Sequence, residues 1–501
     1  MSQEKSDYRS IFKNTSLLGG VQIIIIIIAI VRSKFSALLI GPTGMGVIYL
    51  ITSTTGFIGT LTNFGLATVA IKNIAKANAT NNQSRVSKVV KTFNKLVWIT
   101  GILGSISVIG LSPWLSQITF GNSNYTFAFC ILSVTLLLAQ LNTGHFVILQ
   151  GLRQFKNLAL SNLFSGLLIL VCTVPILYFF KIEGVVFSIL MYSVIPLTIS
   201  WLFTRNIQFK EVIVSNQRLI QQGKELFFLG FTISLTRLMP LGATLLLNAY
   251  VSNLGGVAQV GLFTAGFSII STYTGMIFTA METEYFSRLS SLSSLVDSYK
   301  KAINQQLEIA FLLICPIINL FLVFIHWGIV ILYSNEFTQI DDMMRWAVLG
   351  LMFKAIAWPM GYLLLVKEDS KLFFINEALA NIFLVILNVI FYKFLGITGL
   401  GISFLISCLI NLIQIFSIIN FKYKFKFEKE FVPMFIIQFL VTVSCFLSIF
   451  FIKSSYNYYL SIPLAFISIF YSFKELDKKM QIASLIKNKL GVLIVNKNAK
   501  K

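Results

Sequence analysis

The chain has 501 residues, of which 56% are hydrophobic and only 12% are charged. A soluble protein of this length cannot bury so much apolar surface, so the composition excludes an ordinary soluble enzyme or binding module. The net charge of +21 has the sign expected for a nucleic-acid partner, but the basic residues lie between long apolar runs, as in membrane proteins. We therefore expect no nucleic-acid partner.

Apolar runs of membrane-spanning length recur along the whole chain. Because about 20 apolar residues cross a bilayer as a helix, the pattern predicts an all-α, polytopic membrane protein with about 14 transmembrane helices. The predicted spans are 16–40, 46–71, 93–112, 125–149, 157–180, 184–204, 226–250, 257–285, 307–327, 343–366, 372–392, 397–420, 432–452 and 456–473.

The placement of basic residues predicts the orientation in the membrane. If the N-terminus is cytoplasmic, most of the 40 Lys and Arg residues lie in inside segments. The outside loops then hold only Lys181, Lys393 and Lys453. This bias predicts that both termini are cytoplasmic and that the basic excess attracts anionic membrane lipids.

A weak internal repeat divides the predicted spans. Residues 13–75 and 224–292 share an order of basic residue, Leu-Gly, apolar run, cation, glycine turn, apolar run and basic residue. Internal repeats of this kind are frequent in transporters. The repeat predicts two six-helix lobes, 1–210 with spans 1–6 and 211–421 with spans 7–12. Spans 13 and 14 would follow in 422–475, and a basic cytoplasmic tail in 476–501.

Five cationic residues are assigned to predicted spans, where a charge costs a few kcal/mol unless it faces water or a ligand. Arg345 lies beside Asp341 and Asp342 and is expected to pair with them, and the other four are Arg32, Lys34, Arg237 and Lys354. Arginine forks match phosphate oxygens bidentately, and the guanidinium stays charged at physiological pH. We therefore predict a cationic, anion-binding cavity formed by these four residues. Snorkelling to the interface is the alternative for each of them.

Three further charges are candidates for ion pairs or for coupling to an ion. Glu377 in span 11 is as well suited to pair with Lys354 as to contact a substrate. Glu284 and Arg288 lie four residues apart at the end of span 8, a spacing that favours an ion pair on one helix.

The turn between the first two predicted spans is rich in glycine. Gly41, Pro42, Gly44 and Gly46 are candidates for a gate, although tight turning alone explains glycine there. The five cysteines and two histidines have no metal-ligand spacing, so we expect neither a metal nor a cofactor. A nucleotide-binding loop of the Gly-x-x-x-x-Gly-Lys-Ser/Thr type is absent from the sequence, so direct use of ATP is not expected.

Residues 332–377 carry a recognisable pattern. A Ser-Asn-x-Phe-Thr turn is followed by Trp346, Gly350, Lys354, Gly361-Tyr362, Lys367 and Glu377. The stretch resembles the O-antigen and enterobacterial-common-antigen translocases (Wzx-type flippases) of the multidrug/oligosaccharidyl-lipid/polysaccharide exporter superfamily. LLIGPTGMG at 38–46, FGNSNY at 120–125 and EYFSRL at 284–289 are similar to other elements of that family, with Ser287 in place of a proline.

This resemblance implies a non-enzymatic flippase in a bacterial cytoplasmic (inner) membrane. Its substrate would be undecaprenyl pyrophosphate carrying a short O-antigen-like oligosaccharide, moved to the outer leaflet by alternating access between two lobes. The implied role is in polysaccharide and lipopolysaccharide biosynthesis. Membrane lipids, a polysaccharide polymerase and a chain-length regulator would be partners.

Three alternatives remain open at this point. A lipid II flippase of the same superfamily would use similar cavity cations. A drug/cation antiporter would call for buried acids, whereas the deep charges here are mainly cationic. A polysaccharide polymerase or ligase would need a sizeable outside loop, and all predicted outside loops are short.

Overall fold

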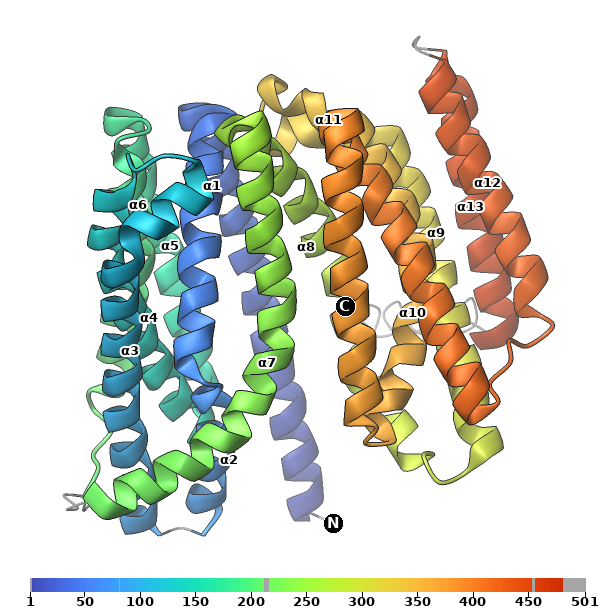
Figure 1. Cartoon of the computed structure of the whole chain (residues 1–501). Coiled ribbons are helices and arrows are strands. Elements are labelled where there is room, and N and C mark those ends of the chain that lie inside the picture. The colour runs from blue at the N-terminus through green and yellow to red at the C-terminus, as the bar shows by residue number, and fades with distance from the viewer. Residues whose placement is uncertain (1, 81, 211–215, 453–455, 481–501) are drawn as a thin grey trace, which may run out of the picture. The chain divides into compact units, whose positions relative to one another are not determined.

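The computed structural model describes residues 2–480 except 81, 211–215 and 453–455. Every regular element in these ranges is helical (Figure 1). The helices are α1 (Ser2–Asn63), α2 (Leu66–Ala79), α3 (Gln83–Phe120), α4 (Thr126–Gly151), α5 (Phe155–Phe180), α6 (Gly184–Thr204), α7 (Asn216–Gly255), α8 (Val257–Ser291), α9 (Val296–Leu332), the 3₁₀ helix η1 (Asn335–Ile340), α10 (Asp341–Val366), α11 (Ser370–Tyr423), α12 (Phe431–Phe451) and α13 (Asn457–Met480).

Ten helical segments of the described chain are long and apolar enough to cross a membrane, so the protein is a multi-pass membrane protein. One of them, α11, contains two of the predicted spans, and α1 contains the first predicted span and most of the second. Two other predicted spans lie in α7 and α13, which are not among the ten. The number of 14 spans and the cytoplasmic position of the termini stay predictions.

The prediction that residues 46–71 form one continuous helix is wrong. α1 ends at Asn63, and Phe64 and Gly65 both adopt positive φ, of 50° and 63°. Glycine tolerates this left-handed conformation, which ends one helix and lets the next begin at a new angle. α2 is therefore a separate, amphipathic helix that packs its apolar face on α3 and α4.

α11 is an antiparallel hairpin of two helices. Gly396 breaks it with a φ of 59° and a ψ of −143°. Gln414 Nε2 donates to Asn376 Oδ1 over 2.8 Å, although 38 residues separate them and a straight helix would place them about 57 Å apart. Ser403 donates to the side-chain oxygen of Asn388 from one arm to the other. The two arms lie side by side in orange in Figure 1.

We expect Ser403→Ala to lower the free energy of unfolding by about 1–3 kcal/mol, because it leaves the buried amide oxygen of Asn388 without its donor. Thermal unfolding in detergent measures the loss. Ser417→Ala is the matched control, because that exposed hydroxyl donates only to the Ile413 carbonyl of its own helix. Equal losses in the two variants would contradict a cross-arm role for Ser403.

Asp369 joins the two ends of the hairpin. It lies between α10 and α11, and its Oδ2 accepts from Lys422 Nζ at 2.6 Å and from the Tyr423 hydroxyl. The hydrogen bonds from Lys422 and then from Tyr423 hold the pKa of the Asp369 carboxyl below its ordinary value of 3.8.

This lowered pKa predicts a pH dependence of stability. The contribution of Asp369 is fully present above the ordinary carboxyl pKa of the unfolded chain and is lost as pH falls through the lower, folded value. We expect Asp369→Asn to have a melting temperature that falls less than that of the wild type between about pH 5 and pH 3. Parallel melting curves for the two proteins over this window would show that Asp369 makes no such contribution.

The described chain forms two compact units. One comprises the described residues of Met1–Ala265 with Val330–Phe337, and the other comprises those of Gly266–Ile329 with Thr338–Lys501. We call them the N-unit and the C-unit. The N-unit thus contains α7 and the start of α8, beyond the lobe boundary predicted at residue 210. The division into lobes at 210 and 421 stays a prediction.

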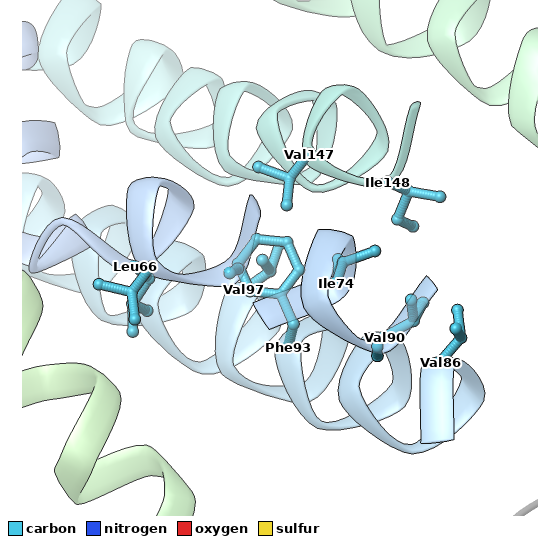
Figure 2. Packing of buried hydrophobic residues seen from close by; sticks show 11 residues of the cluster. Leu66, Ile74, Val86, Val90, Phe93, Val97, Val147 and Ile148 are labelled. Atoms are coloured by element: carbon cyan, nitrogen blue, oxygen red, sulfur yellow. The ribbon is translucent and has the colours of Figure 1, made fainter. Parts of the chain in front are cut away.

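In the N-unit, α2, α3 and α4 share a buried apolar core. Figure 2 shows Leu66 and Ile74 of α2 facing Phe93 and Val97 of α3. Val147 and Ile148 of α4 close the cluster, and most of its side chains are almost fully buried. Burial of each such side chain contributes about 1.5–3 kcal/mol, so this core fixes the relative positions of the three helices.

In the C-unit, α12 and α13 form a helical pair attached to α9. Asn319 of α9 donates to Thr442 Oγ1 of α12 at 2.9 Å and to Ser468 Oγ of α13 at 3.2 Å. Lys479 Nζ of α13 lies 2.5 Å from Glu308 Oε2 of α9. Buried hydrogen bonds and an ion pair thus hold the last two helices to the unit, and the predicted tail beyond Met480 lies outside the described residues.

Candidate functional site: polar cavities in the two units

Arg32, the first predicted site residue, lies against an aromatic ring. Its guanidinium carbon is 4.9 Å from the ring centroid of Tyr192 in α6, a cation–π distance. Arg32 is half-buried and forms no ion pair with a described acid. The cation is therefore held in place by a ring that leaves its charge unneutralised.

Tyr192 also lines a cavity of about 330 Å³ within the N-unit. Because Gly56 lines the same cavity, both arms of α1 reach Tyr192, although Arg32 and Gly56 would be about 36 Å apart in a straight helix. Gly41, with a φ of 60° and a ψ of −169°, is the break between these arms. The predicted glycine turn therefore brings Arg32 against Tyr192 of the cavity wall, although Arg32 itself is not among the lining residues.

Most of the residues that line this cavity carry hydroxyl or amide groups, and none of them is acidic. Several threonines donate their only hydroxyl proton to a carbonyl one turn earlier, so the oxygen keeps its acceptor capacity. The polar lining residues are Thr52, Thr55, Thr60, Thr62, Asn63, Thr100, Thr135, Gln140, Thr143, Tyr192 and Ser193. Such a wall suits a ligand with many hydroxyl donors.

Lys34 has a partner of its own. Its Nζ donates to the carbonyl oxygen of Val330 at 2.7 Å, in the last turn of α9. Carbonyls in the last turn of a helix lack intrahelical donors, and a lysine there satisfies one of them. Lys34 and Arg32 thus point to different partners.

Arg237 lies in α7 of the N-unit and is exposed. It forms no ion pair with any residue of the described ranges. It is not among the residues that line the 330 Å³ cavity, so the structure does not bring it together with Tyr192.

Lys354 lines a second cavity, of about 370 Å³, within the C-unit. Glu377 lines it too, but the two side chains do not form an ion pair within 4.0 Å. Trp358 and Tyr362 add aromatic surface, with their ring centroids 5.2 Å apart. The complete lining is Lys354, Ala357, Trp358, Gly361, Tyr362, Leu365, Phe373, Asn376, Glu377, Asn411 and Ile415.

One lining group of the second cavity lacks a hydrogen bond. The side-chain oxygen of Asn411 is buried and has no partner among the described residues. A buried, unpaired acceptor costs about 1–3 kcal/mol. A ligand that donates a hydrogen bond there would remove this cost.

Glu284 and Arg288 form an ion pair with each other, with Arg288 Nε 3.3 Å from Glu284 Oε1. Arg288 also donates to Gln306 Oε1 at 3.0 Å. Neither residue lines the cavity of Lys354 and Glu377. The geometry makes Arg288 a link between α8 and α9 in the C-unit.

The glycines of the first turn have different surroundings. Gly41 adopts positive φ, whereas Gly46 is helical and lies against the backbone of α8. A Cβ built on Gly46 would be 2.0 Å from the carbonyl oxygen of Val257, and one built on Gly261 would be 1.9 Å from that of Pro42. Because Gly46 and Gly261 have no Cβ, the backbones of α1 and α8 pack in direct contact at these two residues. The gate role of the turn remains a prediction.

The cavity walls are the part of the site that the sequence analysis missed. Tyrosine and threonine carry no charge and are common in transmembrane helices. Tyr192 and the threonines of the cavity are therefore recognisable only after the folded helices bring them together. The spacing of Thr52, Thr55 and Thr62 along α1, close to the helical repeat, was the available signal.

These features define a polytopic, all-helical membrane protein with polar cavities among its spanning helices. Residues 37–342 match the family described as "Polysaccharide biosynthesis protein". The chain belongs to this family, because the match covers more than half of its length. No curated protein matches the chain significantly.

Solved structures share the fold at low sequence identity. A structure titled "Lipid II flippase MurJ, inward closed conformation" has 13% identity and a TM-score of 0.72, and the match covers 93% of this chain and 99% of that one. An inward-facing multidrug resistance MATE family transporter of the MOP superfamily has 16% identity and a TM-score of 0.68, over 80% of this chain and 94% of that one. By these titles, the neighbours are a flippase and a transporter, not enzymes.

Proposed function

We propose that the protein is a transporter that flips a lipid-linked oligosaccharide across the bacterial cytoplasmic membrane. The substrate is an undecaprenyl-pyrophosphate-linked, O-antigen-like repeat unit, which moves from the cytoplasmic to the outer leaflet by alternating access. The family match supports a role in polysaccharide biosynthesis, and the fold is that of transporters and flippases. A polysaccharide polymerase and a chain-length regulator are the partners we propose downstream.

The observation that carries this proposal is the hydroxyl-lined cavity beside Arg32. Its threonine, amide and tyrosine oxygens accept hydrogen bonds, which suits the hydroxyl donors of a glycan. The guanidinium group of Arg32 forms no ion pair with a described acid, so both of its outer nitrogens can bind pyrophosphate oxygens. Polar walls and a cation together fit a head group that is both polyhydroxylated and anionic.

The C-unit cavity supports the same substrate class. Trp358 and Tyr362 offer aromatic faces of the kind on which sugar rings stack, and the Asn411 side-chain oxygen lacks a donor. Lys354 is placed to contact an acidic group of the repeat unit. The negative charge of Glu377 would repel a second anion from the same cavity. We assign Lys34 to the end of α9 rather than to substrate, because its ammonium group donates one of its hydrogen bonds to the Val330 carbonyl oxygen.

Two alternatives make different predictions about ligands. A lipid II flippase would bind the peptide-bearing head group in preference to a plain oligosaccharide. A drug/cation antiporter would bind a quaternary ammonium compound, which the acid-free N-unit cavity and the free charge of Arg32 disfavour.

Ligand-induced thermal stabilisation tests the proposal. The purified protein is heated with undecaprenyl-pyrophosphate oligosaccharide, with lipid II or with tetraphenylphosphonium at equal concentration. A ligand at 100 times its dissociation constant stabilises the folded state by about 2.7 kcal/mol. We expect this stabilisation with the oligosaccharide lipid and its loss in Arg32→Ala. Stabilisation by tetraphenylphosphonium alone would contradict the proposal.

A further inference from the structure

A third cavity lies apart from the two sites described above. It has a volume of about 390 Å³, belongs to the N-unit and is formed by α3, α4 and α6. We call it the α3–α4–α6 groove. Its lining residues are Asn94, Val97, Trp98, Leu141, His145, Leu197, Thr198 and Trp201.

The floor of the groove is rigid. Val97 belongs both to the groove and to the buried core of α2, α3 and α4 (Figure 2). Leu141 and His145, four residues apart, present one face of α4. The groove is therefore a fixed feature of the fold.

Its walls end in half-exposed tryptophans. Trp98 of α3 and Trp201 of α6 are 50% and 49% exposed. Trp201 lies in the last turn of α6, whereas Trp98 lies inside α3, near the start of the predicted span 93–112. Half-exposed tryptophans near the ends of a span are typical of a membrane–water interface, where one part of the ring meets lipid and the other meets head groups. The groove thus opens to lipid at the level of the head groups.

One cation lies beyond each tryptophan, Lys91 toward the start of α3 and Arg205 just after the end of α6. The guanidinium carbon of Arg205, the residue after α6, lies 5.9 Å from the Trp201 ring. Lys91 lies on the face of α3 that carries Asn94 and Trp98, about 10 Å along the helix from Trp98. Both cations are exposed, and neither pairs with a described acid. Lys91 and Arg205 do not line the groove themselves, but they place positive charge beside its two tryptophans, on α3 and at the end of α6.

His145 adds a hydrogen-bond acceptor at the floor. Thr204 Oγ1 lies 2.7 Å from His145 Nδ1 and 3.0 Å from the Ser200 carbonyl oxygen. When the hydroxyl proton is given to the carbonyl, Thr204 accepts from His145 Nδ1. In the neutral ring the proton is then on Nδ1, which leaves Nε2 as an acceptor. A hydroxyl group in the groove would satisfy it.

We propose that the α3–α4–α6 groove binds an anionic glycerophospholipid with a hydroxylated head group. The phosphate lies between Lys91 and Arg205, a head-group hydroxyl donates to His145 Nε2, and a chain lies along the apolar wall between Trp98 and Trp201. Charge complementarity with these two cations selects an anionic lipid over a zwitterionic one. This inference is independent of the flippase substrate, since it uses none of the residues assigned to that substrate.

Tryptophan fluorescence of the full-length protein in vesicles tests the proposal, because Trp98 and Trp201 are natural reporters. The probes are phosphatidylglycerol and phosphatidylcholine with brominated chains, each mixed into phosphatidylcholine vesicles at the same fraction. We expect markedly stronger quenching by the brominated phosphatidylglycerol. The excess is lost in Trp98→Phe/Trp201→Phe and retained in Trp114→Phe, which removes an exposed tryptophan further along α3.

A matched pair of variants separates the groove from general surface charge. Lys91→Gln/Arg205→Gln removes both cations beside the tryptophans, and each basic residue near a membrane surface contributes about fivefold to anionic-lipid binding. Lys72→Gln/Lys76→Gln removes two exposed cations from α2, a helix that contributes no residue to the groove. We expect at least a fivefold weaker preference for phosphatidylglycerol only in the first variant. Equal quenching by both lipids in the wild type, or equal losses in both variants, would overturn the proposal.

Discussion

Arg32→Ala is expected to reduce flipping of undecaprenyl-pyrophosphate oligosaccharide at least tenfold. A hydrogen bond to a charged group contributes about 1.5–3 kcal/mol, and about 1.4 kcal/mol is a factor of ten. Arg32 is free of any described acid, so the whole of its charge is available to the pyrophosphate. Initial rates of head-group exposure in reconstituted liposomes measure the effect.

Three further variants define the role of Arg32. Arg32→Lys keeps the charge but loses the fork, so we expect an intermediate rate. Tyr192→Phe keeps the ring beneath the guanidinium but removes one acceptor from the cavity wall, so we expect a smaller loss than in Arg32→Ala. Arg85→Ala removes an exposed arginine at the start of α3 and is the control. A normal rate in folded Arg32→Ala protein would exclude Arg32 from the transport step.

Gly46→Ala is expected to be the most destabilising single-methyl substitution in α1. The added Cβ would lie 2.0 Å from the Val257 carbonyl oxygen and 2.9 Å from the Val257 carbonyl carbon, and a backbone neighbour of this kind cannot rotate away. Overpacking of a tight interior costs about 1–3 kcal/mol, occasionally more, and here α1 and α8 must separate. The melting temperature in detergent measures the loss.

Gly56→Ala is the matched control on the same arm of α1. A Cβ on Gly56 meets nothing within 4 Å, and alanine is favoured over glycine in a helix by about 1 kcal/mol. We therefore expect Gly56→Ala to be neutral or stabilising. A Gly46→Ala protein as stable as the wild type would mean that the close packing of α1 on α8 does not limit stability.

Most of the helical layout was predictable from the sequence, because apolar runs of spanning length are a strong one-dimensional signal. The turn at Gly41 was predicted as well, since a glycine-rich segment stands between two apolar runs. The break at Phe64 and Gly65 was not predicted, because it falls inside a run that remains apolar on both sides. A hydropathy pattern predicts which segments can lie in lipid, but it does not predict where a helix breaks within such a segment.

The cavities were less predictable than the helices. Arg32 and Lys34 look equivalent in the sequence, yet one faces an aromatic ring and the other the carbonyl of Val330, 296 residues away. Which of two neighbouring cations is free depends on contacts that no local pattern encodes. The threonine lining and Tyr192 also arise only from tertiary packing, because uncharged polar residues carry no positional signal in a span.

Translocation by the wild-type protein is the most direct test of the proposed flippase function. Liposomes with and without the protein receive fluorescent undecaprenyl-pyrophosphate oligosaccharide, with and without an imposed ion gradient, and an external reagent scores the exposed head groups. We expect protein-dependent exchange of the head group between leaflets, much faster than in protein-free vesicles and sensitive to Arg32→Ala. Folded wild-type protein that moves no lipid-linked glycan under any gradient, but exchanges organic cations for ions, would contradict this function.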